Sequence, residues 1–265
     1  MNILMFLAAL AVITLGHFFR IRRWKSFISV YEDSHDSDLM FCTGIGYLVD
    51  NVLPFHVGDI VRAAIIGKKL KNGAAFSLAV IIIDRILDVF VVAFIYGTIF
   101  FASGKNLMNF IFFTGFSALL LFFLGLSVTF SKRFKKCVLV FSSIFNTKIQ
   151  LCILEFVWSF ICTIRNTVKK IDKTKLVLRT LCMWSCYILS YLMYSNCLKN
   201  TSFVDVFNNL FSIDSYSPFV DYVRHGFSHY YFIFLLFNFL TCVSIIVVAF
   251  FERFKKCSSE NKGEL

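Results

Sequence analysis

Five long apolar runs alternate with short basic segments along the chain. The runs cover residues 2–19, 75–101, 107–130, 176–198 and 229–251. Each is close to the roughly 20 residues that a helix needs to cross a hydrocarbon core about 30 Å thick. The runs are continuous and lack the strict alternation of a membrane β-strand. The pattern therefore predicts transmembrane helices.

The composition places the whole chain in the membrane class. Of its 265 residues, 58% are hydrophobic and 18% aromatic, which is far more apolar than a soluble domain of this size. No polar stretch approaches the roughly 100 residues of a soluble domain. We therefore predict an all-α, polytopic integral membrane bundle of about five to seven helices. Residues 1–257 are expected to form a single transmembrane domain, and residues 258–265 a polar tail.

The basic residues gather on one predicted side of the membrane. They form clusters at residues 20–25, 68–71, 132–136, 165–175 and 253–256. The positive-inside rule places these clusters in the cytoplasm, with the N-terminus outside and the C-terminus inside. A plasma membrane is expected, in particular a bacterial inner membrane. The net charge of +11 lies almost wholly on this rim, which should attract anionic lipid headgroups rather than nucleic acid.

Two further apolar segments, residues 39–67 and 137–163, begin and end on the predicted cytoplasmic side. Neither is therefore expected to cross the membrane as one helix. Pro54 and Gly58 break the first segment, since proline lacks a backbone donor and glycine loosens the backbone. We predict a re-entrant pair of short helices there, with Asp59 near the start of the second, where the helix dipole favours a carboxylate. The second segment fits either a hairpin or an interfacial amphipathic helix.

Polar and ionisable residues concentrate at this break and in the next apolar run. They are Asn51, His56, Asp59, Arg62, Asp84, Arg85 and Asp88. Ionisable groups at membrane depth are costly, and so they are normally paired, shielded from lipid or functional. Asp59 and Arg62 share a helix face at i, i+3, as Asp84 and Asp88 do at i, i+4.

Two interpretations of these residues are compatible with each other. In the structural one, Arg62 pairs with Asp84 or Asp88 and holds the broken helix against the long one. In the functional one, Arg62 and Arg85 hold a headgroup phosphate while the carboxylates meet an amine or sugar hydroxyls.

The same residues resemble the transmembrane family of lysylphosphatidylglycerol synthase/flippases and their stand-alone relatives. The family pattern is Gly-Tyr-x-x-Asn-Asn-x-x-Pro-x-Arg-x-Gly-Glu-x-x-Arg, followed by Glu-Arg-x-x-Asp. The matching positions are Asn51, Pro54, Gly58, Arg62, Arg85 and Asp88. Asp59 and Asp84 stand where the family has Glu, which keeps the charge. His56 stands where the family has Arg, and a partly charged imidazole would grip a phosphate less well.

The resemblance covers most of the chain and weakens beyond residue 200. It implies that the protein binds an anionic or lipid-linked substrate, either a phospholipid or a polyprenyl-linked lipid. It also implies flippase-like translocation of that substrate between leaflets. The seven polar residues named above would line the cavity. In the family, lysine transfer belongs to a separate soluble domain, so we expect a transporter rather than an enzyme.

Two alternatives remain open. One is a membrane glycosyl- or headgroup-transferase in cell-envelope polymer or lipid assembly, which the resemblance to the stand-alone relatives implies. Asp36 and Asp38 form an Asp-x-Asp, a pattern that holds a divalent metal in sugar-nucleotide transferases. A solvated acidic loop explains the same two residues. The other alternative is a non-catalytic subunit that recruits a partner through the basic rim. The nine cysteines include no Cys-x-x-Cys, and we predict no metal and no other cofactor.

Overall fold

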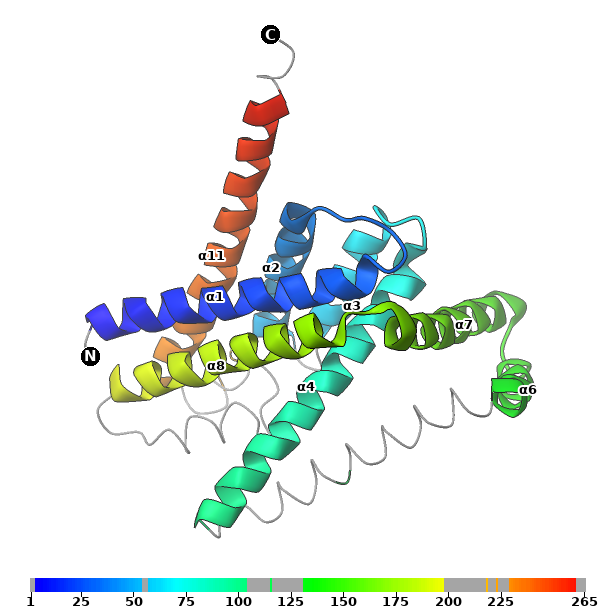
Figure 1. Ribbon diagram of the computed structural model, residues 1–265, viewed down its shortest axis with the longest axis horizontal. Coiled ribbons are helices and arrows are strands. Elements are labelled where there is room, and N and C mark those ends of the chain that lie inside the picture. The colour runs from blue at the N-terminus through cyan, green and yellow to red at the C-terminus, as the bar shows by residue number, and fades with distance from the viewer. Residues whose placement is uncertain are drawn as a thin grey trace. The chain divides into compact units, whose positions relative to one another are not determined.

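The computed structural model describes residues 3–53, 57–103, 115, 131–197, 218, 223 and 229–260 (Figure 1). These residues form helices and a few short turns, with no strand among them, which confirms the all-α prediction. By its internal contacts the chain divides into two compact units, one made of Met1–Lys71 with Asp172–Leu265 and the other of Asn72–Ile171. The predicted domain boundary at residue 257 stays a prediction.

The first unit contains the N-terminal helices and the last two helices of the described chain. They are α1 (Ile3–Ile28), α2 (Asp36–Val52), α3 (Val57–Gly67), α8 (Lys173–Cys197) and α11 (His229–Glu260). Helix α1 runs alongside α8, α2 packs against both α3 and α11, and α1 also contacts α2 and α11 (Figure 1).

Three helices in the described part of the chain are long and apolar enough to cross a membrane. They are α1, α8 and the Tyr231–Phe254 portion of α11. These helices confirm three of the predicted apolar runs. The run at 75–101 is also helical, within α4 (Gly73–Ser103), although it carries three ionisable residues near its middle. The run at 107–130 lies outside the described residues apart from Gly115.

Small and hydroxyl-bearing residues hold the long helices of the first unit close together. The Ser190 hydroxyl of α8 donates a hydrogen bond of 2.8 Å to the Ala9 carbonyl of α1. The hydroxyls of Thr14 in α1 and Ser244 in α11 lie 2.8 Å apart. Inside a lipid bilayer the hydrophobic effect does not drive helices together. Interhelical hydrogen bonds and the close packing of small residues stabilise helix association there instead.

The predicted helix break is confirmed by the end of α2 and the start of α3. Helix α2 ends at Val52, and Leu53, which precedes Pro54, has extended backbone angles of φ −97° and ψ 137°. Steric contact with the proline ring disfavours helical angles at the preceding residue, so the sequence itself ends α2 here. Helix α3 then begins at Val57 and folds back against α2. The side of the membrane from which this hairpin enters stays a prediction.

The two helices of the hairpin pack almost backbone to backbone. The Gly58 amide donates a hydrogen bond of 2.8 Å to Asp50 Oδ1, so a carboxylate of α2 caps the first turn of α3. A Cβ atom on Gly46 would lie 2.9 Å from the Gly58 carbonyl oxygen, which is closer than real contacts allow. The absence of a side chain at these two positions therefore permits the close packing.

The second unit contains α4 together with α6 (Ser131–Ser142) and α7 (Thr147–Lys170). Helix α7 packs against both α4 and α6. The segment 137–163, for which the sequence leaves two forms open, is thus a helical hairpin whose turn lies between Ser142 and Thr147. An apolar cavity of about 200 Å³ between α6 and α7 has Trp158 in its lining.

Candidate functional site

Arg62 is the central ionisable residue of the hairpin. Its side chain is only 3% exposed, and its Nη2 lies 3.1 Å from Asp59 Oδ1, one turn earlier on α3. The prediction that Asp59 and Arg62 share a helix face is therefore confirmed. Each of these two charges alone would carry a large desolvation cost in a buried position. Pairing them offsets part of this cost.

Aromatic rings from two other helices surround the Arg62 guanidinium. Its Cζ lies 5.4 Å from the centre of the Trp24 ring of α1 and 6.0 Å from the centre of the Tyr47 ring of α2. The Cζ of Arg20, also on α1, lies 5.9 Å from the same Tyr47 ring. These distances allow cation–π attraction, which strengthens away from water. Helices α1, α2 and α3 thus meet around Arg62.

The sequence pattern does not predict the contribution of α1 to this cluster. It assigns Arg20 and Arg23 to the basic cytoplasmic rim, yet Arg20 is buried and Arg23 is 0% exposed. His17 is also buried and lies 3.0 Å from the Tyr187 hydroxyl of α8. The spacing of His17, Arg20 and Trp24, at i, i+3 and i+7, is the signal that could have placed them on one buried helix face.

Asn51 does not share the contacts described for Arg62 and is instead hydrogen-bonded to α11. Its side chain is buried, and its Nδ2 donates a hydrogen bond of 3.1 Å to the Cys242 sulfur of α11. Asn51 therefore links the end of α2 to α11. The predicted residues Pro54 and His56 lie outside the described residues.

The remaining predicted site residues lie on α4, in the second unit. Asp84 and Asp88 are 2% and 8% exposed, and Arg85 between them is half-buried. The two carboxylates thus occupy one buried face, as their i, i+4 spacing predicted. Their pairing with Arg62 stays a prediction.

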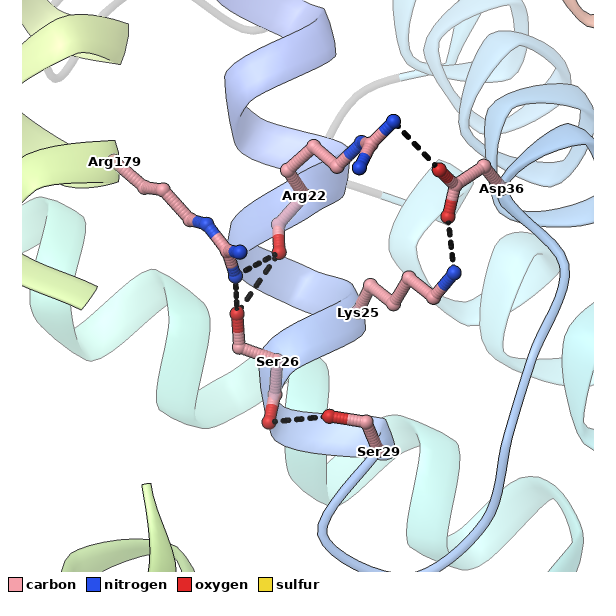
Figure 2. A network of polar contacts seen from close by, with 6 residues as sticks. All are labelled: Arg22, Lys25, Ser26, Ser29, Asp36 and Arg179. Carbon is pink, nitrogen blue, oxygen red and sulfur yellow. Dashed lines mark hydrogen bonds and ion pairs between the residues drawn. The ribbon is translucent and has the colours of Figure 1, made fainter. Parts of the chain in front are cut away.

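The acidic pair at the start of α2 is engaged by basic side chains. Asp36 lies 3.1 Å from Arg22 and 2.7 Å from Lys25, both on α1 (Figure 2). Figure 2 also shows Arg179 of α8 reaching the Arg22 carbonyl and the Ser26 hydroxyl of the same helix. These ion pairs and hydrogen bonds together connect α8, α1 and α2.

Asp38, the second acidic residue of the pair, forms ion pairs with two other basic residues. Its Oδ1 lies 2.6 Å from Lys69 Nζ, just after α3, and 2.5 Å from Arg253 Nη2 of α11. The interpretation of Asp36 and Asp38 as a solvated acidic loop is therefore wrong, because both lie in the first turn of α2 and are ion-paired, with side chains 16% and 20% exposed. Within the described ranges, no three His, Cys, Asp or Glu side chains are grouped so that they could hold a metal ion.

The ionic contacts of Asp38 predict a measurable pH dependence. Burial raises the pKa of Asp38, but its hydrogen bonds and attraction to Lys69 and Arg253 outweigh burial and hold the pKa below its usual value of 3.8. A carboxyl whose pKa is lower in the folded state stabilises the protein above its unfolded pKa, and this stability is lost as pH falls through the folded pKa.

We expect Asp38→Asn to lower the free energy of unfolding by about 1 kcal/mol near neutral pH, since these ion pairs are partly exposed. The difference from the parent protein should shrink below a pH of about 4. Thermal unfolding of the purified protein across this pH range measures both effects. Asp33→Asn, at an exposed position just before α2, is the matched control. An equal loss of stability at both ends of the range would contradict the assignment.

Comparison with known proteins identifies the family to which the chain belongs. The model of the family described as "Lysylphosphatidylglycerol synthase TM region" matches residues 1–202. Searches of curated proteins and of solved structures found no match. The matched residues include the hairpin with Arg62 and the acidic face of α4. The resemblance seen in the sequence is thereby confirmed, and the chain belongs to the lysylphosphatidylglycerol synthase TM region family of membrane proteins concerned with lipids.

Proposed function

We propose that this protein binds an anionic or lipid-linked substrate and translocates it between membrane leaflets. The observation that carries the proposal is the buried ion pair of Arg62 and Asp59 in the second half of a broken helix. Broken helices in membrane transporters build substrate sites at the break, because the freed backbone groups and helix ends are polar. An ionisable group at such a position indicates function.

The chemistry of Arg62 favours an anionic substrate. A guanidinium stays charged and presents several donors in one plane, which matches the oxygens of a phosphate. Asp59 holds the Arg62 side chain in place. An incoming phosphate group would share Arg62 with Asp59 while the acyl or polyprenyl chains remain in lipid. The sequence pattern also offers Asn51, His56, Asp84, Arg85 and Asp88 as substrate-binding residues, and we propose this role for each of them.

We also propose an orientation, which rests on the distribution of basic residues. The basic segments face the cytoplasm of a plasma membrane, and the N-terminus lies outside.

The paired state of Asp36 and Asp38 weighs against the transferase alternative, because a metal would have to displace four basic side chains from these carboxylates.

Leaflet-resolved labelling in reconstituted vesicles tests this function. We expect Arg62→Gln and Asp88→Asn to reduce the transfer of one lipid class by at least about tenfold, a factor that corresponds to the loss of a single charge-assisted hydrogen bond. Lys68→Gln, at an exposed position just after α3, should transfer lipid like the parent protein. All variants must be reconstituted in equal amounts. An unchanged distribution of every lipid in both site variants would overturn the proposal.

A further inference from the structure

Three hydrogen-bond donors around Arg62 have no acceptor within the described part of the chain. They are Arg62 Nε, Trp24 Nε1 and the Tyr47 hydroxyl, and all three atoms are buried. A buried donor without an acceptor costs about 1–3 kcal/mol, and native proteins keep few of them. Three such donors in one cluster need a specific explanation.

The three donors lie on three different helices. Trp24 of α1 and Tyr47 of α2 lie beside the guanidinium of Arg62, which belongs to α3. The Arg62 Cζ lies 5.4 Å from the Trp24 ring and 6.0 Å from the Tyr47 ring. Asp59 engages the Arg62 Nη2 atom and leaves the Nε atom without a partner. The hairpin packing of Gly46 against Gly58 fixes α3 beside α2, and Tyr47 follows Gly46 directly.

The chemistry of the three groups selects the kind of ligand. An indole N–H and a guanidinium only donate hydrogen bonds, and a tyrosine hydroxyl can donate one. The cluster therefore offers donors and a positive charge to a group rich in acceptors. A phosphate has this property, whereas an ammonium group would meet like charge and further donors. The two flat rings lie beside the guanidinium, and the Arg62 side chain is only 3% exposed.

We propose that Trp24, Tyr47 and Arg62 form a subsite for the phosphate group of the substrate. In this subsite the phosphate oxygens accept a hydrogen bond from each of the three donors. This inference rests on the proposed function, because it names the part of the substrate that the hairpin binds. The phosphate can come from a lipid phosphodiester or from a free phosphate ion. The chemistry of recognition is the same in both cases.

Single-donor variants of the purified full-length chain test the subsite. Tyr47→Phe and Trp24→Phe each remove one donor and keep an aromatic ring beside Arg62. The probes are short-chain phosphatidylglycerol, inorganic phosphate and short-chain diacylglycerol, which lacks phosphate. We expect each variant to bind phosphatidylglycerol about tenfold more weakly, the effect of one lost hydrogen bond to a charged group. Binding of diacylglycerol should not change.

A buried tyrosine outside the cluster provides the matched control. Tyr194 of α8 is fully buried and its ring lies near that of Phe237, so Tyr194→Phe should leave phosphatidylglycerol binding at the parent level. The thermal midpoint of the Tyr47→Phe protein, measured without ligand, should equal or exceed that of the parent, since removing a donor that lacks an acceptor costs nothing. Trp24→Phe also removes ring atoms at a position that is 3% exposed, so its midpoint should fall.

The outcomes separate this inference from the proposed function. Weaker binding of both phosphatidylglycerol and inorganic phosphate supports a subsite that accepts phosphate from either source, and weaker binding of the lipid alone supports a lipid headgroup subsite. Parent-like affinity of both variants for both phosphate probes would overturn the subsite, even when Arg62→Gln stops lipid transfer. Normal lipid transfer by both site variants, Arg62→Gln and Asp88→Asn, would overturn the proposed function instead.

Discussion

Gly58→Ala is expected to prevent stable packing of the α2–α3 hairpin and to cost more than about 4 kcal/mol in the free energy of unfolding. A Cβ atom at position 58 would lie 1.9 Å from the Gly46 carbonyl oxygen and 2.7 Å from Asp50 Oδ1. The first of these atoms belongs to the backbone of a neighbouring helix, so no side-chain rotation can relieve the clash. The second accepts the hydrogen bond that caps α3.

Thermal unfolding of the purified protein, followed by circular dichroism, measures this loss. Gly46→Ala should have a smaller effect in the same direction, because its Cβ would lie 2.9 Å from the Gly58 carbonyl oxygen. Ile60→Ala is the matched control on the same helix, since Ile60 is 59% exposed. A Gly58→Ala protein as stable as the Ile60→Ala protein would show that the two helices do not approach as closely as described.

The hairpin shows how far local sequence rules reach. Pro54 determines the end of α2 through its effect on Leu53, and both are chain neighbours, so the break was predictable. The prediction that Gly58 helps to break the helix is wrong, because Gly58 lies in the first turn of α3. Its close contact with Gly46 depends on how two helices meet, and no local pattern encodes that distance.

The site itself divides in the same way. The placement of Asp59 and Arg62 on one helix face follows from helical spacing alone and was predicted. The approach of Trp24 and Tyr47 to Arg62 joins three helices and was not. The burial of Arg20 was missed because basic residues at the end of an apolar run normally mark the cytoplasmic side. A charge pattern reports topology on average, and only packing reveals which members of the pattern are buried.

The acidic pair gives a second example of long-range packing. Asp38 meets Lys69 and Arg253, which are distant in sequence, so its environment could not be read from its neighbours. The Asp-x-Asp spacing kept a metal-binding interpretation open at the sequence level. The ion pairs now explain the same carboxylates as connections from α2 to α1, to the turn after α3 and to α11.

The second large effect is expected at the ion pair of the hairpin. Arg62→Gln alone should cost about 3–5 kcal/mol, because it removes the guanidinium and leaves the Asp59 carboxylate buried beside a neutral side chain. Asp59→Asn alone should also destabilise, since Arg62 is the more deeply buried partner. The double variant Asp59→Asn/Arg62→Gln should recover at least about 2 kcal/mol of the summed losses, because neither charge remains to be desolvated.

This double variant distinguishes the structural from the functional interpretation of Arg62. Unfolding measurements on the two single variants and the double variant give the coupling energy, and lipid transfer is measured on the same preparations. We expect stability to return in the double variant while lipid transfer stays at least about tenfold below that of the parent, because a neutral amide in place of the guanidinium cannot supply the charge that a phosphate needs. Recovery of transfer together with stability would instead mean that the ion pair only holds the hairpin together, and that the substrate is bound elsewhere.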